Sequence, residues 1–157
     1  MKPSVYLETT IISYLTADPS RDIVIAGHQQ VTHDWWNTRR QKFDLLVSQL
    51  VVSEIRSGDP VMAAKRLDLI KGLKALSLTE TALDVAQALV SQGPLPKKAA
   101  EDALHIALAS VYGMDYLLSW NCKHISNLFI QKDLAKILAR FGFRLPTIGS
   151  PEALMGE

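Results

Sequence analysis

The sequence predicts a single α/β domain, a three-layer α/β/α sandwich whose parallel sheet has four or five strands. Short apolar runs alternate with longer segments of helical periodicity, so that one or two helices separate each predicted strand from the next. Strands joined by helical connections pair in parallel, and the helices then cover both faces of the sheet. The 157 residues fit one domain, and we expect it to span residues 1–157 because no internal repeat or long linker interrupts them.

The predicted strands are short apolar runs bounded by turn or capping residues. The first, Val5 to Leu7, and the second, Phe43 to Val47, are strongly apolar. Tyr116 to Trp120 is a further buried run, and it lies between helical segments. The full set of predicted strands covers 5–7, 43–47, 76–78, 116–120 and the edge pair 147–148.

Helices are predicted between these strands from their capping residues and apolar spacing. The segment from Lys97 to about Tyr112 is the best helix in the chain, since it is rich in Ala and Leu and stops at Gly113. A second long helix is expected from Asp22 to about Arg39. The expected helix-capping residues elsewhere are Thr9 or Thr10, Ser20, Ser48, Asp59 with Pro60 after it, and Thr79.

The composition excludes several classes of protein. Hydrophobic residues make up 48% of the chain and charged residues 21%, which indicates a folded globular protein. The formal net charge of +1 gives no bulk attraction for nucleic acid. A single cysteine excludes an intramolecular disulfide and zinc sites that need two or four cysteines. Stretches without Asp, Glu, Lys or Arg, such as Ala103 to Met114, are shorter than the roughly 18 apolar residues of a membrane span. We therefore expect a cytoplasmic protein with no membrane segment.

Three acidic residues stand out because of their position relative to the predicted strands. Glu8 directly follows the first strand, and Glu54 lies in an otherwise apolar stretch after the second. Asp102 lies early in the Ala-rich helix that leads to the fourth strand. In parallel α/β sheets, functional groups gather outside the carboxyl ends of the strands. A further polar cluster follows the fourth strand and consists of Ser119, Asn121 and His124.

Acids brought together at one sheet edge favour a divalent cation. Carboxylates from distant parts of the chain would repel one another there, and a cation would relieve the repulsion. Mg²⁺ prefers carboxylate and water ligands. Such a site activates water and stabilises charge during displacement at a phosphoryl group.

Four blocks of the sequence resemble the PIN-domain ribonucleases, of the kind found in VapC-type toxins. The family has an acid after the first strand, a second acid in a short helix after a Ser, an Asp heading an Ala-rich helix, and a strand ending in Thr or Ser before Asp or Asn. The matching blocks here are 6–10 (YLETT), 48–54 (SQLVVSE), 101–109 (EDALHIALA) and 117–125 (LLSWNCKHI). The resemblance covers about residues 4 to 148, and four blocks in this order and spacing form a joint signal.

The resemblance implies a Mg²⁺- or Mn²⁺-dependent ribonuclease. Glu8, Glu54 and Asp102 would hold the metal, with Asn121 as a supporting catalytic residue. It further implies an RNA substrate, a small antitoxin protein as partner, and a homodimer. Two departures from the family pattern suggest one firm cation site and modest activity: Glu8 stands where Asp is usual, and Asn121 is neutral where a fourth acid is usual.

Simpler structural roles remain open for most of these residues. Glu8 could stabilise the start of the following helix through its dipole, and Glu54 could pair with a nearby base such as Arg56. Asn121 could be a turn residue. We expect His105 to be a core or supporting residue and Glu101 to face solvent. The remaining residues have similar alternatives: a backbone hydrogen bond for Ser119, a surface loop for His124, and core packing for one ring of Trp35–Trp36.

Two other functions remain as alternatives. The chain could be a catalytically degenerate PIN domain that binds RNA or protein without cleaving it, which the Glu8 and Asn121 departures would explain. It could also be a flavodoxin-like ligand-binding domain. The latter is weaker, because no glycine-rich phosphate loop follows any predicted strand.

Overall fold

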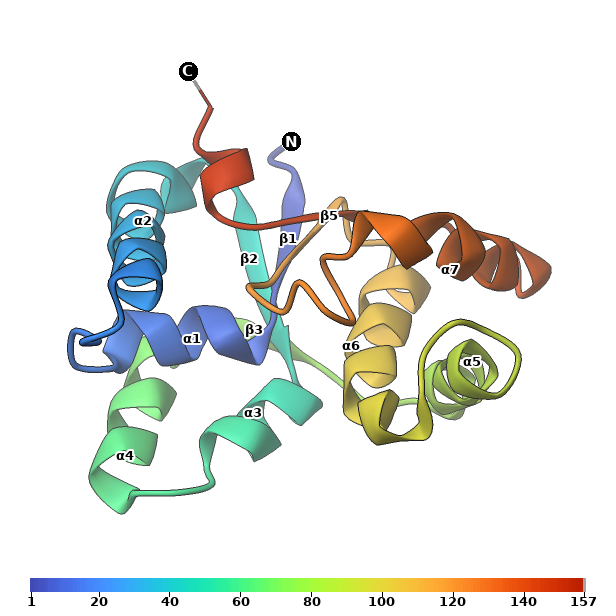
Figure 1. The fold of residues 1–157 in the computed structure, drawn as a ribbon, viewed down its shortest axis with the longest axis horizontal. Helices are drawn as coiled ribbons and strands as arrows, with labels where there is room; N and C mark the ends of the chain where they lie inside the picture. The colour runs from blue at the N-terminus through green and yellow to red at the C-terminus, as the bar shows by residue number, and fades with distance from the viewer. Residues whose placement is uncertain (157) are drawn as a thin grey trace.

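A five-stranded parallel sheet forms the centre of the molecule (Figure 1). The structure is a computed structural model and describes residues 1–156. The strands lie in the order β3-β2-β1-β4-β5, and every neighbouring pair is parallel. The sheet thus has the upper number of strands expected from the sequence. The strands are β1 (Ser4–Leu7), β2 (Asp44–Ser48), β3 (Lys74–Leu76), β4 (Tyr116–Leu118) and β5 (Thr147–Gly149).

Helices flank the sheet in two groups, which makes the fold a three-layer α/β/α sandwich as predicted. Helix α1 packs against α2, α3 and α4, whereas α5 packs against α6 and α7. Figure 1 shows the first group on the left of the sheet and the second group on the right. The α-helices are α1 (Thr9–Thr16), α2 (Ile23–Arg39), α3 (Gln49–Ile55), α4 (Pro60–Leu69), α5 (Glu80–Ser91), α6 (Ala100–Val111) and α7 (Leu128–Arg140). Short 3-10 turns cover Arg40–Lys42, Lys97–Ala99 and Glu152–Leu154.

The strand order reverses once along the carboxyl edge of the sheet. The chain builds β1, β2 and β3 outward in one direction and then returns to add β4 and β5 on the other side of β1. Ligands of open α/β sheets bind where the strand order reverses in this way. Here that point lies between β1 and β4, where the Glu8 N–H donates to the Leu118 carbonyl at 3.1 Å.

The core lies on both faces of the central strands. Val5, Tyr6 and Leu7 of β1 are fully buried, because helices cover this strand from both sides. Trp35 is also fully buried, while its neighbour Trp36 is half-buried and lies under the Arg40 guanidinium at 4.9 Å. One ring of the Trp pair therefore packs into the core, as expected. No helix among residues 1–156 has the length and apolar character needed to cross a membrane.

Several helix starts confirm the predicted caps. Ser48 accepts from the Val51 N–H, Asp59 from the Val61 N–H, and Thr79 from the Ala82 N–H. Each side chain satisfies a backbone donor that has no partner within its helix.

Two predicted caps are wrong. Helix α2 is capped by Asp22, which accepts from the Val24 and Ile25 N–H groups, and Ser20 instead accepts from the Asp22 N–H at 3.1 Å. Helix α1 has Glu8 at its N-cap position with no side-chain cap, and neither Thr9 nor Thr10 caps it. Both threonine hydroxyls donate to carboxylates of the candidate site instead.

Three predicted strands are displaced by one or two residues. The second lies at Asp44–Ser48, the third at Lys74–Leu76, and the fourth ends at Leu118 before Ser119 and Trp120. Pairing with the neighbouring strands sets these limits: Tyr6 of β1 lies opposite Leu46 on one side and Leu117 on the other, and β3 pairs with β2. Apolar runs alone do not fix the register of a strand that is buried on both faces.

Candidate active site

Glu8 is a buried carboxylate at the carboxyl ends of β1 and β4. Its side chain is 5% exposed. The Oε1 atom accepts two hydroxyl hydrogen bonds of 2.6 Å, one from Thr10 on α1 and one from Ser119 after β4. Among residues 1–156, Oε2 accepts no hydrogen bond. Two hydroxyl donors thus fix the orientation of the carboxylate and leave one oxygen available to a ligand.

Glu54 lies on α3 and is held by two groups from other elements. Its Oε1 atom accepts a 2.5 Å hydrogen bond from the Thr9 hydroxyl and lies 2.7 Å from Nε2 of His105. His105 is on α6 and is 1% exposed, so its ring occupies a fixed position in the core. Helices α1, α3 and α6 therefore meet at this one carboxylate.

A buried hydrogen-bond chain continues behind His105. Its Nδ1 atom lies 2.7 Å from the Tyr6 hydroxyl, which lies 2.7 Å from the Ser48 hydroxyl. The ionised Glu54 carboxylate can only accept a hydrogen bond, so Nε2 of His105 carries a proton and donates it. This hydrogen bond fixes the orientation of the ring. Burial, offset in part by the Ser48 hydrogen bond, raises the pKa of Tyr6, so its hydroxyl stays protonated. The chain connects Glu54 to the ends of β1 and β2.

The local environment of Glu54 separates its pKa from that of Glu101. Burial raises the pKa of Glu54, but the hydrogen bond and charge of His105, together with Thr9, outweigh burial and lower it to about 2. Glu101 has the opposite shift: its hydrogen bond with Glu54 and the negative charge of Glu54 raise its pKa. The expectation that Glu101 simply faces solvent is therefore incomplete. Its side chain is exposed, yet it also contacts a second carboxylate.

Asp102 lies in the first turn of α6 and pairs with the loop after β4. Its Oδ2 atom lies 2.9 Å from Nδ1 of His124. Among residues 1–156, Oδ1 of Asp102 has no hydrogen-bond partner. The two side chains are partly exposed, at 25% and 16%, so solvent and ligands can reach them.

Asn121 has a turn-forming role in the structure. Its Oδ1 atom accepts hydrogen bonds from the backbone N–H groups of Lys123 and His124, at 3.2 and 3.0 Å. The Asn121 N–H in turn donates to the Ser119 hydroxyl at 2.9 Å. These contacts shape the loop that presents His124 to Asp102.

Two solved structures share this fold with the chain. No protein-family model matches the sequence, and neither does any curated protein. VapBC2 from Rickettsia felis, bound to a DNA fragment from its promoter, aligns with a TM-score of 0.58 and 13% identity over 93% of this chain and 97% of its own. The Mycobacterium tuberculosis toxin VapC20, which cleaves the sarcin–ricin loop, aligns with a TM-score of 0.59 and 11% identity over 77% of this chain and 92% of its own.

The chain has a VapC-like PIN-domain fold. At these identities the likeness establishes the fold, and the site has to be judged from its own residues. On this PIN-like sheet Glu8 and Ser119 follow the adjacent strands β1 and β4. Glu54 and Asp102 lie on the helices next to that edge.

The donor set of the candidate site suits a hard cation, although it does not form a closed cage. Within residues 1–156, no group of three or more His, Cys, Asp and Glu side chains is arranged to hold a metal ion. Two observations are still consistent with a bound metal ion at this site. Glu8 and Asp102 each have one oxygen held by protein donors and one without a partner. The hydrogen bond with Glu54 and the negative charge of Glu54 raise the pKa of Glu101, and a cation would favour the ionised form of both groups.

The sequence pointed to Ser119 and His105 without their partners, and it indicated Thr9 and Thr10 only as helix caps. Thr9, Thr10 and Ser119 all donate to site carboxylates, and Tyr6 supports His105. A polar side chain within a buried strand was the available signal for Tyr6, because a buried hydroxyl needs a partner. The sequence contains no signal for the pairing of Thr9 with Glu54, since the two are 45 residues apart.

Proposed function

We propose that the chain is a divalent-metal-dependent endoribonuclease and the toxin of a toxin–antitoxin pair. One observation supports this proposal: Glu8 follows β1 at the reversal point of a sheet whose fold is shared with the sarcin–ricin-loop-cleaving toxin VapC20, and Glu54 and Asp102 lie on α3 and α6. Oxygen donors of this kind favour Mg²⁺ or Mn²⁺.

Each acid would have a defined part in the reaction. Glu8, Glu54 and Asp102 would hold the cation, which supplies an acidified water and charge stabilisation at the phosphoryl oxygens when bound. Thr10 and Ser119 keep one Glu8 oxygen turned toward the protein, and His105 does the same for Glu54. His124 orients Asp102. Such supporting hydrogen bonds reduce the reorganisation that ligand binding requires.

The fold also supports a protein partner for this chain. The Rickettsia felis neighbour is a VapBC2 complex that is bound to promoter DNA. We therefore include a small antitoxin among the proposed partners, and a homodimer as the proposed assembly. Expression of the chain alone should arrest growth, and co-expression of the adjacent small reading frame should relieve the arrest. Equal growth with and without the chain would argue against the toxin role.

The catalytic proposal is tested by substituting single acids. Glu8→Gln and Asp102→Asn keep the size of each side chain and remove its charge. Both variants should lose Mg²⁺- or Mn²⁺-dependent RNA cleavage while their thermal unfolding midpoints stay close to that of the parent. Asp133→Asn, an exposed acid on α7, is the matched control and should cleave as the parent does. If both site variants cleave at the parental rate, the assignment of the site is wrong.

A catalytically degenerate domain is the second candidate. The open arrangement of the acids and the turn-forming role of Asn121 favour it. Calorimetric titration with Mn²⁺ separates the two functions. A nuclease should bind the ion at a site that Asp102→Asn weakens, and a chain that takes up no Mn²⁺ would be a binding module.

A further inference from the structure

Three aromatic rings from distant parts of the chain gather at one place. The ring of Trp120, which follows β4, is stacked on His28 of α2, with centroids 4.1 Å apart and planes 11° apart. Tyr14 of α1 also stacks with Trp120, at 6.2 Å and 23°. Residues 14, 28 and 120 are called the aromatic stack below. All three are partly exposed.

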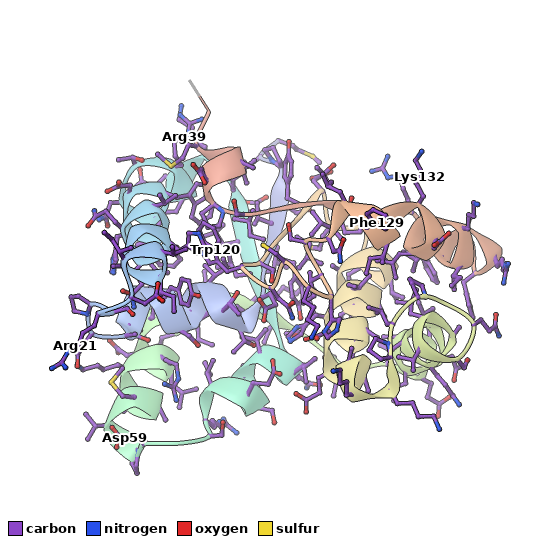
Figure 2. The ribbon with its side chains drawn as sticks, in the orientation of Figure 1. Arg21, Arg39, Asp59, Trp120, Phe129 and Lys132 are labelled. Atoms are coloured by element: carbon purple, nitrogen blue, oxygen red, sulfur yellow. The ribbon has the colours of Figure 1, made fainter. Side chains whose placement is uncertain are left out.

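The aromatic stack is tied directly to the candidate active site. The backbone N–H of Trp120 donates to the Thr10 hydroxyl at 2.9 Å, and that hydroxyl donates to Glu8 at 2.6 Å. Tyr14 lies one helical turn after Thr10, so the two share a face of α1. Figure 2 shows Trp120 beside α2, toward the middle of the molecule. The stack is thus one residue from Ser119 and one helical turn from Thr10, the two residues whose hydroxyls hold Glu8.

Trp120 is packed in part against the core, but core packing does not account for the two rings stacked on it. Trp35, on the same helix as His28, is fully buried, whereas the stack stays open to solvent. The His28 ring makes no hydrogen bond to any side chain or backbone group of residues 1–156. Trp120 is held firmly, because its Nε1–H donates to the Thr32 hydroxyl at 2.8 Å. Rigid rings with an accessible face can accept another ring at little entropic cost.

We propose that Tyr14, His28 and Trp120 form a stacking subsite for an unpaired nucleobase of the RNA strand. This inference rests on the proposed function for the identity of the substrate as RNA. Proteins recognise single-stranded RNA by stacking splayed bases on Phe, Tyr, Trp and His rings. A base held here places its neighbouring phosphate toward Glu8 and its partners. Lys123, exposed on the loop after Trp120, is available to that phosphate backbone.

Binding of a fluorescein-labelled oligoadenylate tests the subsite. The measurement uses an Asp102→Asn background in Mg²⁺, which removes a proposed catalytic acid that does not touch the stack. An oligomer of the same length with abasic sugars has the same charge and no bases. The Asp102→Asn protein, with its aromatic stack intact, should bind oligoadenylate roughly 5- to 100-fold more tightly than the abasic oligomer, the range expected for one stacked base.

Variants of the outer rings should remove this preference. His28→Leu and Tyr14→Leu should reduce oligoadenylate affinity toward that of the abasic oligomer and leave abasic binding unchanged. His28→Phe retains a flat ring and should retain the preference. Phe129→Leu is the matched control, because Phe129 is a 95% exposed aromatic residue outside the stack. Thermal unfolding of each variant shows whether it has kept the parental fold.

The outcomes separate this inference from the proposed function. Leucine variants that bind oligoadenylate as the parent does, or a parent with no preference for bases, would overturn the subsite. If the subsite is overturned but the unsubstituted chain cleaves RNA, the ribonuclease proposal stands without the subsite. A stack-dependent preference in a chain that cleaves no RNA would support the subsite and overturn the ribonuclease.

Discussion

His124 Nδ1 lies 2.9 Å from Asp102 Oδ2 and joins the loop after β4 to the first turn of α6. The contact spans 22 residues of sequence and brings a titratable ring to a proposed metal ligand. The turn that Asn121 forms positions His124 for this contact. The partly exposed pair is accessible to a ligand.

Loss of the His124 ring should weaken metal binding. We expect His124→Ala to reduce Mn²⁺ affinity by about 10- to 100-fold, because hydrogen-bond partners of metal ligands commonly contribute that much. Calorimetric titration measures the change. His33→Ala is the control, since His33 lies on α2 and makes no side-chain hydrogen bond within residues 1–156. An unchanged affinity in His124→Ala would show that Asp102 needs no support from this ring.

Asn121→Asp should distinguish the two roles considered for this position. A carboxylate oxygen can accept from the Lys123 and His124 N–H groups as the amide does, so we expect the free energy of unfolding to change little. Asn121→Ala should lower it by about 1 kcal/mol, because both donors lose their acceptor. Urea denaturation gives these values. If Asn121 also lies close enough to assist the cation, Asn121→Asp should tighten Mn²⁺ binding. Unchanged Mn²⁺ affinity would leave this residue with its turn role alone.

Tyr6→Phe should destabilise the domain. The substitution removes the hydroxyl between His105 and Ser48 and leaves two buried polar groups without this partner. We expect a loss of about 1–3 kcal/mol in the free energy of unfolding, measured with urea. Tyr112→Phe removes an exposed hydroxyl that donates to the Ser77 carbonyl and should cost about 0.5 kcal/mol. Similar losses in the two variants would mean that the buried chain adds nothing to stability.

Two glycines should respond in opposite directions to alanine. A Cβ at Gly93 would lie 2.5 Å from the Leu89 carbonyl oxygen and 2.6 Å from Ile137 Cδ1, so Gly93→Ala should cost about 1–3 kcal/mol. Gly27 lies within α2 with nothing near its Cβ position, and Gly27→Ala should gain about 0.5–1 kcal/mol. Thermal unfolding compares the two. A stabilised Gly93→Ala would show that α5 and α7 are less closely packed there than the structure indicates.

The sequence by itself determined the layers of the fold and the set of acids worth testing. Helical periodicity and short apolar runs are local properties, so they identified α2 and the strands to within one or two residues, and α6 to within three because residues 97–99 form a 3-10 turn. Parallel pairing then placed Glu8 at the sheet edge, with Glu54 and Asp102 on adjoining helices. These inferences need only the direction of the strands.

Tertiary structure alone decided the partners of those acids. Thr9 and Thr10 could serve as helix caps by local rules, yet with α1 packed against α3 the Thr9 hydroxyl donates to Glu54, and the Thr10 hydroxyl donates to Glu8. His105 reaches Glu54 across 51 residues. Hydrogen bonds of this kind depend on distances between elements, which no spacing along the chain encodes, and the aromatic stack beside Glu8 arises in the same way.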